Sequence, residues 1–285
     1  MRGETMSAIP RLSPSIASVL LDRSAAHAWQ AHRLLGGGLR EESSPAMEKG
    51  KILEILLGLG DIKKLVVVDA KDWRTKVAQE AREVAEMEGR TPVLAAKYTE
   101  YEAAAESIIE RLAAKKVHMV GATQVRLEWQ SQPMDARAAK GVACSGVADL
   151  IQSEGGKCLI SDLKIVDNAH PDALARNMVT MGRDLQAAAY VEAWEMLHPQ
   201  DAGRTEFRLI CCEAKPPYAA TIAYLDGSFI ELGRRRWGRA VQEWGLCLAT
   251  NRWPDYSHDF VRLSPLGWQL SQEEGASMTQ TEESQ

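Results

Sequence analysis

The sequence predicts an α/β domain with a central mixed β-sheet flanked by helices. Three observations lead to this prediction: amphipathic helical segments dominate the N-terminal half, most strand-like segments lie after Val117, and a long helical segment separates the last strands from the earlier ones. Segments in this order are typical of a layered domain in which helices cover a sheet. The 285 residues, of which 45% are hydrophobic, are enough to bury a substantial core.

The predicted helices are recognised by apolar residues spaced three and four positions apart. In the first of them, Ser13 is the expected N-cap and Pro14 takes the first helical position, where both residue types are favoured. The predicted helices cover residues 13–35, 46–60, 74–88, 98–116, about 172–197 and about 228–249.

The predicted strands are short apolar runs or alternate between apolar and polar residues. Two of them flank Gly155-Gly156, which predicts an antiparallel hairpin with a glycine turn. Residues 1–12 are expected to be a flexible N-terminus, residues 13–270 a single domain, and residues 271–285, which have little to anchor them, a disordered tail. The predicted strands cover residues 63–69, 123–130, 142–152, 157–166, 206–214 and 218–226.

The composition excludes several classes of protein. No apolar run approaches the roughly 20 residues of a membrane span, and the first 20 residues lack the layout of a secretory signal, so a cytoplasmic protein is expected. The spacing of the cysteines suits neither a disulfide framework, nor a zinc site, nor an iron–sulfur cluster. The net charge of −5 argues mildly against wholesale coating of nucleic acid but allows a local basic groove. The five cysteines are Cys144, Cys158, Cys211, Cys212 and Cys247.

Chemically active side chains gather in the predicted hairpin. Asp162 and Lys164 are two positions apart on a strand, so they share a face. Asp149 falls near Asp162 across the ladder, where opposite residues are about 5 Å apart at Cβ. Two carboxylates this close raise each other's pKa, and a divalent cation such as Mg²⁺ or Mn²⁺ relieves their repulsion. Lys164 would then position and deprotonate a water or stabilise a developing oxyanion.

The alternative is a set of exposed charges on a sheet face. Three features argue against it. Both acids lie inside apolar strands, where unpaired charge is costly. The two acids are on adjacent strands, and a further carboxylate, Glu54, stands in the otherwise apolar helical stretch 52–57.

These residues resemble the PD-(D/E)XK nuclease superfamily and imply its restriction-endonuclease-like core. Asp149 matches the first acid, with Ala148 in place of the usual proline, and Asp162-Leu163-Lys164 matches the (D/E)XK element. Glu54, four residues after Gly50, falls where many relatives have a helical acid or a histidine. The resemblance implies that Asp149, Asp162, Glu54 and the backbone carbonyl of Leu163 hold one or two Mg²⁺, with Mn²⁺ able to substitute.

The helix after the hairpin contains Gln186 and Tyr190, which match the QxxxY motif of the RecB-like branch. Residues four apart share a helix face, so both side chains could reach the site or the DNA backbone. The alternative for both is helix packing. The resemblance places Gln186 and Tyr190 with Glu54, Asp149, Asp162 and Lys164 as catalytic residues.

A more extensive resemblance, from about residue 12 to 268, is to the RecE-type recombination exonucleases of phages and prophages. Ala25 and Asp255 depart from that family's usual proline and glycine. The resemblance implies a Mg²⁺-dependent exonuclease that resects linear double-stranded DNA from 5′ to 3′, a single-strand annealing partner, a trimeric or tetrameric homo-oligomeric ring, and a bacterial or phage-infected host cell. The similar segments are LSPSIASVLLDRSAAHAW, DWRTKVAQEAREVAEMEGRTPVL, FRLICCEAKPPYAATIAYLD and CLATNRWPDYS.

The densest basic run, residues 233–239, is a candidate DNA-binding surface, because arginines and an aromatic ring suit phosphate contact and base stacking. The alternative is a solvated helix face. A PD-(D/E)XK endonuclease and a non-catalytic DNA-binding relative remain rival readings of the whole chain. The candidate DNA-binding residues are Arg234, Arg235, Arg236, Trp237 and Arg239, with Arg126, Arg137 and Lys140 as others near the core strands.

Overall fold

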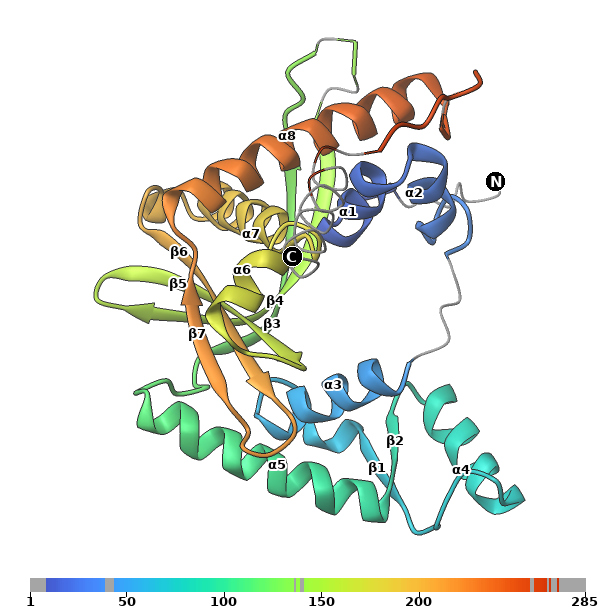
Figure 1. Ribbon diagram of the computed structural model, residues 1–285, viewed down its shortest axis with the longest axis vertical. Coiled ribbons are helices and arrows are strands. Elements are labelled where there is room, and N and C mark those ends of the chain that lie inside the picture. The colour runs from blue at the N-terminus through green and yellow to red at the C-terminus, as the bar shows by residue number, and fades with distance from the viewer. Residues whose placement is uncertain are drawn as a thin grey trace, which may run out of the picture. The chain divides into compact units, whose positions relative to one another are not determined.

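The computed structural model describes residues 9–38, 44–135, 137–138, 141–256, 259–265, 267 and 271. The chain divides into two compact units, Met1–Pro254 and Asp255–Gln285. The helices α1 to α8 and the strands β1 to β7 lie in the first unit. Within this unit a β-sheet is sandwiched between helices, which confirms the predicted α/β fold class (Figure 1).

The main sheet has five strands in the order β3-β4-β5-β6-β7. Its pairings are antiparallel except for β5 with β6, so the sheet is mixed, as predicted. A parallel pair needs a crossover connection, and α6 and α7 provide it. The strands are β3 (Ala122–Ser131), β4 (Val142–Glu154), β5 (Lys157–Val166), β6 (Thr205–Glu213) and β7 (Ala220–Tyr224).

The β4–β5 hairpin has the predicted glycine turn. Glu154 pairs with Lys157, which leaves Gly155 and Gly156 as the two turn residues. Their φ angles of 57° and 77° are both positive, the conformation that a two-residue hairpin turn of this kind requires and that glycine adopts without steric cost. This turn fixes the register that brings Asp149 and Asp162 to the same level of the sheet.

Helices cover both faces of the sheet (Figure 1). One face packs against α1 (Pro14–Asp22), α2 (Ala25–Ala31), α7 (Arg183–Leu197) and α8 (Gly227–Thr250). The other packs against α3 (Pro45–Leu56) and α5 (Ala95–Ala114). Strand β5 contributes to both layers, because Ile160 belongs to the first cluster of buried side chains and Leu163 to the second.

A smaller parallel sheet lies apart from the main one. Strands β1 (Leu65–Val68) and β2 (Thr91–Leu94) pair with each other, and α4 (Lys76–Met87) connects them. The predicted strand at 63–69 therefore forms but does not join the central sheet.

Two predicted helices are each interrupted. The helix predicted over 13–35 is wrong as a single element, because Ser24 caps a new helix by accepting a hydrogen bond from the backbone of His27. The helix predicted over 172–197 is likewise two, α6 (Pro171–Asn177) and α7, with Gly182 between them at a φ of 63°. Polar caps and a left-handed glycine end helices that apolar periodicity alone would continue.

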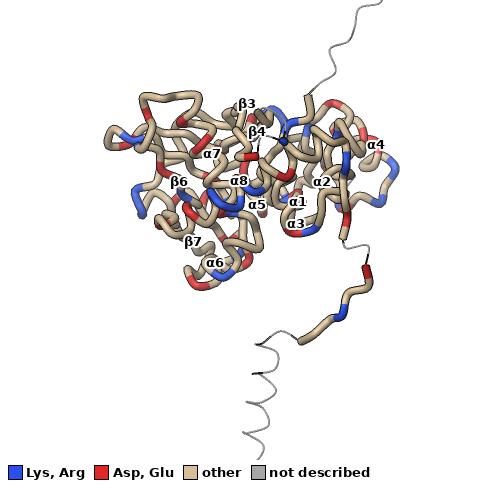
Figure 2. The backbone as a smooth tube through the Cα atoms, turned by 90° about the horizontal axis from the view of Figure 1, so that it is seen from above, with Lys and Arg blue, Asp and Glu red and all other residues tan. Residues whose placement is uncertain are grey.

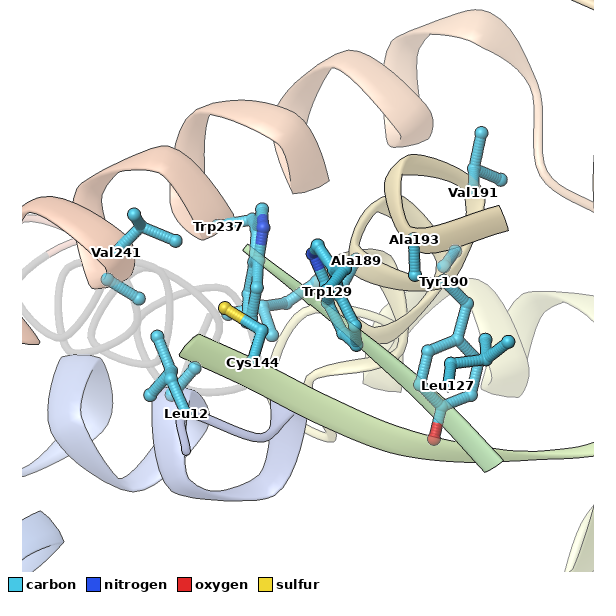
Figure 3. Close-up of a cluster of buried hydrophobic side chains, with 14 of the residues drawn as sticks. Leu12, Leu127, Trp129, Cys144, Ala189, Tyr190, Val191, Ala193, Trp237 and Val241 are labelled. Carbon is cyan, nitrogen blue, oxygen red and sulfur yellow. The ribbon is translucent and has the colours of Figure 1, made fainter. Parts of the chain in front are cut away.

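The predicted flexible N-terminus is wrong at its last residue. Leu12 is fully buried, and its backbone hydrogen-bonds to Ala143 and Ser145 of β4. Figure 3 shows Leu12 beside Cys144 in the core. Residues 1–8 and 272–285 lie outside the described residues, so the disordered tail and the domain limits stay predictions.

Candidate active site

Asp162 and Lys164 lie together on β5, as predicted. Asp162 is 1% exposed, and its Oδ1 accepts a hydrogen bond of 2.8 Å from Nε2 of Gln186 on α7. The other oxygen, Oδ2, forms an ion pair with the ammonium of Lys164, whose side chain is 20% exposed. This oxygen therefore has one partly exposed counter-charge.

The carboxyl group of Asp149, on the neighbouring strand β4, lies beside Asp162 and Lys164. Its Oδ2 accepts the backbone N–H of Leu163 at 2.9 Å. Burial, and next the charge of Asp162, raise the pKa of Asp149 to about 7. The strand is irregular here: Ala148 and Leu150 pack on opposite faces of the sheet, although residues two apart in a regular strand share a face. This irregularity accompanies the turn of the Asp149 carboxylate toward β5.

Glu54 comes to the site from α3, on the opposite face of the sheet from α7. It is half-buried between the buried Leu53 and Ile55. Burial raises the pKa of Glu54, and the nearby Asp162 raises it further, whereas Lys164 lowers it. Glu54 therefore belongs to the same electrostatic cluster as the hairpin residues.

Gln124 was not predicted as a site residue. Its Nε2 donates to Oε1 of Glu54 at 2.6 Å, and in the β3–β4 register it falls opposite Asp149, between the pairs Thr123–Leu150 and Val125–Ala148. Its φ of 51° is left-handed, which costs a non-glycine residue about 1–3 kcal/mol and is concentrated at functional sites. A glutamine in an alternating strand carries no sequence signal for this conformation.

The two residues of the QxxxY motif, Gln186 and Tyr190, make different contacts. Gln186 contacts Asp162 directly. Tyr190 is 5% exposed, and its hydroxyl donates to the carbonyl of Val147 at 2.9 Å. Its ring lies so close to Gly146 that a Cβ there would come within 2.4 Å of it. Tyr190 holds β4 against α7 through this contact, and its catalytic role stays a prediction.

The donor set fits a divalent cation. No group of three His, Cys, Asp or Glu in the described part of the chain forms a ready-made metal cage. Yet the carboxyl groups of Glu54, Asp149 and Asp162 interact electrostatically, and Lys164 is in ion-pair contact with Asp162 alone of the three. A cation would offset this repulsion, and oxygen ligands alone suit Mg²⁺ or Mn²⁺.

The basic run on α8 does not form the predicted surface. Arg236 is 8% exposed and pairs with Asp184 at 2.7 Å and Asp22 at 3.0 Å. Trp237 is 2% exposed and packs against Trp129, with ring centroids 5.8 Å apart (Figure 3). Both are therefore corrected from DNA contacts to core residues.

The remaining predicted DNA-binding residues differ in their exposure and in their ion pairs. Arg234, Arg235 and Arg239 are exposed, and Arg235 pairs with Glu231, so their DNA contacts stay predictions. Arg137 pairs with Asp135. Lys140 lies outside the described residues. Figure 2 shows basic and acidic positions interspersed along the backbone rather than gathered in one segment.

A basic hollow lies beside Gln186 instead. It has a volume of about 680 Å³ and lies where α1, β4 and the start of α7 meet. Arg33, Arg126 and Arg183 line it together with hydroxyl groups, including that of Ser13. Arg126 pairs with Glu128, whereas Arg33 and Arg183 have no ion-pair partner among the described residues. Of the three arginines, only Arg126 was predicted, because the other two lie in distant segments.

Two further features bear on the class of protein. All five cysteines are buried and free, and burial raises the pKa of each thiol, for Cys144 to about 12. No helix in the described ranges combines the length and the apolar character needed to cross a membrane.

The fold and this cluster define a nuclease class, and comparison with known proteins agrees. The model of the PD-(D/E)XK nuclease superfamily matches residues 11–276, so the chain belongs to that superfamily. Its members typically use divalent metal ions, and membership supports a hydrolytic nuclease.

Among solved structures, a candidate exonuclease from Eubacterium rectale is similar in fold, with a TM-score of 0.54 and 14% identity over 90% of this chain and 91% of that one. The structure of SSO0001 matches with a TM-score of 0.26 and 15% identity over 65% of this chain and 81% of that one, which is too low a score to bear on the fold. No curated protein sequence matches significantly.

Proposed function

We propose that this protein is a Mg²⁺-dependent exodeoxyribonuclease of the RecE type that hydrolyses phosphodiester bonds from the ends of linear double-stranded DNA, with Mn²⁺ able to replace Mg²⁺. One observation carries the proposal. The buried carboxylate of Asp162, oriented by Gln186, lies against Lys164 and next to a second carboxyl, Asp149, whose pKa is raised to about 7.

Each residue of the cluster has a role in this proposal. Asp149, Asp162 and the carbonyl of Leu163, together with Glu54, would hold the divalent ion, which supplies Lewis acidity toward the phosphate and its attacking water. Gln186 fixes the orientation of the Asp162 carboxylate through its 2.8 Å hydrogen bond. The ammonium of Lys164 orients the water and, as an amine, accepts its proton.

The basic hollow supports a path for the DNA backbone. Arg33 and Arg183 present guanidinium groups without ion-pair partners among the described residues, and phosphate oxygens are the partners that arginine suits best. Gln186 lines this hollow and also holds Asp162, so a strand bound there leads to the carboxylates. Binding through phosphates predicts an affinity that falls steeply with salt.

The biological role rests on the RecE-type resemblance of the chain from about residue 12 to 268. The enzyme resects one strand from 5′ to 3′, and a single-strand annealing protein coats the strand that remains. It works as a homo-oligomeric ring of three or four copies in the cytoplasm of a bacterium or a phage-infected host.

The direct test is cleavage of end-labelled linear DNA and of covalently closed circular DNA, in Mg²⁺ and in EDTA. We expect degradation of the linear DNA only, and only with Mg²⁺. Asp162→Ala and Lys164→Ala should abolish it, whereas Lys157→Ala, at the exposed end of the same strand, should not. Equal cutting of circular DNA would indicate an endonuclease, and binding without cleavage a non-catalytic relative.

A further inference from the structure

A second hollow begins at Lys164 and continues along the same face of the sheet. On β5, Asp162, Lys164 and Val166 are two positions apart and share a face. In the parallel register, Asp162 pairs with Leu209 and Lys164 with Cys211. Lys164 and Val166 of β5 and Leu209 and Cys211 of β6 line a cavity of about 330 Å³. Its floor is therefore the direct continuation of the row that contains Asp162.

The walls of this hollow are mainly apolar, with a polar rim. Leu174, Met178 and Met181, from α6 and the segment before α7, lie over the floor. Asn168 and Asn177 also line it, and the Asn177 amide has no hydrogen-bond partner in the described part of the chain. The two hollows share a wall, because Met181 and Arg183 line both.

We propose that this second hollow binds the nucleobase of the nucleotide joined to the scissile phosphate. The proposal rests on the proposed function, because Lys164 belongs both to the catalytic cluster and to this wall. Its aliphatic and thioether side chains suit the faces of a base, and asparagine amides can hydrogen-bond to a base edge. Its volume lies at the small end of the range of about 300–1,000 Å³ for ligand pockets.

The charged side chains of the two hollows indicate which part of a nucleotide each hollow would bind. The hollow beside Gln186 has three arginines and suits phosphates. The second has two cationic side chains, Lys164 and Arg183, and also Asp167, which would repel a phosphate. Lys164 already faces Asp162. A phosphodiester held between the hollows therefore places its backbone in the first and the attached base in the second.

Occupation of this hollow requires the terminal base to leave its pair. Extruding a base costs a few kcal/mol, and least where the base is already unpaired. We therefore compare two linear duplexes whose terminal nucleotide on the degraded strand is either abasic or a mismatched base. Both ends are unpaired, so they differ only in the presence of the base.

The wild-type protein should make the first cut about 10-fold more slowly on the abasic end than on the mismatched end, a difference of 1.4 kcal/mol. In EDTA, the affinity for the abasic end should be weaker by the same factor, which tests the hollow without catalysis. Equal rates and equal affinities, within twofold, would overturn the proposal. If the protein cuts neither these ends nor unmodified DNA with Mg²⁺, the proposed function is contradicted instead. The affinities for the two ends in EDTA then test base binding in the second hollow by themselves.

A substitution that fills the hollow completes the test. Asn177→Trp, at an exposed position that lines it, should slow cutting of the mismatched end about 10-fold and remove the difference between the two ends. Arg176→Trp is the matched control, because Arg176 is exposed on the same helix but does not line the hollow. Thermal unfolding of both variants reports whether they fold. If Asn177→Trp kept the wild-type difference, the base would bind elsewhere.

Discussion

The β4–β5 hairpin and helix α8 both place charged side chains inside apolar surroundings, but they satisfy them differently. On α8, the guanidinium of Arg236 is matched by the carboxylates of Asp184 and Asp22 and the carbonyl of Val179. In the hairpin, Asp149 and Asp162 repel each other, and a single partly exposed lysine, Lys164, pairs with Asp162. A buried charge with complementary partners holds a fold together, whereas buried like charges need a ligand.

The largest expected effect separates catalysis from stability in the hairpin. Lys164→Ala should lower the cleavage rate by about 10²–10⁴-fold, the usual contribution of a group that transfers a proton. With Mg²⁺ present, the free energy of unfolding should change little, because the cation takes over as the counter-charge of Asp162. Cleavage rates and urea unfolding in Mg²⁺ check this. A rate within 10-fold of wild type would remove Lys164 from the chemistry.

Removing the buried cation of α8, Arg236, should lower stability, whereas removing Lys164 should lower the cleavage rate. Arg236→Met leaves the fully buried Asp184 without its ion-pair partner and should lower the free energy of unfolding by about 3–5 kcal/mol. Mg²⁺ should not restore it. The combined variant Arg236→Met/Asp184→Leu should recover part of the loss, because the orphaned charge is removed. A loss below about 1 kcal/mol in urea unfolding would mean that the pair is not structural.

The pH dependence of stability should reveal the repulsion in the hairpin. Because the pKa of Asp149 is raised from 3.8 to about 7, the folded state holds its proton more tightly than the unfolded state. In EDTA, ionisation of Asp149 should therefore reduce stability as the pH rises from about 4 to about 7, by up to about 1.4 kcal/mol per pH unit. Asp149→Asn should flatten this slope and be the more stable protein at pH 7.5. Parallel unfolding curves for the two proteins across this range would contradict the assignment.

The smallest expected effect concerns Gln124, which connects Glu54 to the strand opposite Asp149. Glycine tolerates its left-handed backbone, so Gln124→Gly should be more stable than Gln124→Ala by about 1–2 kcal/mol. Both variants lose the hydrogen bond to Glu54 and should lose activity to a similar degree. Urea unfolding and cleavage rates of the pair separate backbone strain from positioning. Equal stabilities would show that the strain is negligible.

The same comparison explains what the sequence could predict. The period of two along β5 and the two-glycine turn determine which residues share a face and a level, so Asp149, Asp162 and Lys164 could be brought together without a structure. The core role of α8 also left a signal, since its buried residues Gly233, Trp237, Ala240, Val241 and Trp244 follow a helical spacing. The arginines between these positions mask that apolar stripe in the sequence.

Two other features of the site could not be predicted from the local sequence. Arg33 and Arg183 are 150 positions apart and meet only because α1, α2 and α7 pack on one face of the sheet. The left-handed backbone of Gln124 depends on the irregular pairing of β3 with β4, which hydrophobic alternation does not encode. Long-range packing, rather than residue type, creates both.

The central claim is that the hairpin carboxyls form a site for a divalent cation, and calorimetric titration with Mg²⁺ tests it most directly. Metal binding must displace the proton that Asp149 retains near its pKa of about 7. We therefore expect binding at pH 7 to release about half a proton, measured in buffers of different ionisation heat. At pH 9 the proton release should vanish, and Asp149→Asn should weaken Mg²⁺ binding and abolish the proton release at pH 7. Absence of Mg²⁺ binding, or binding with no proton release at pH 7, would contradict the account.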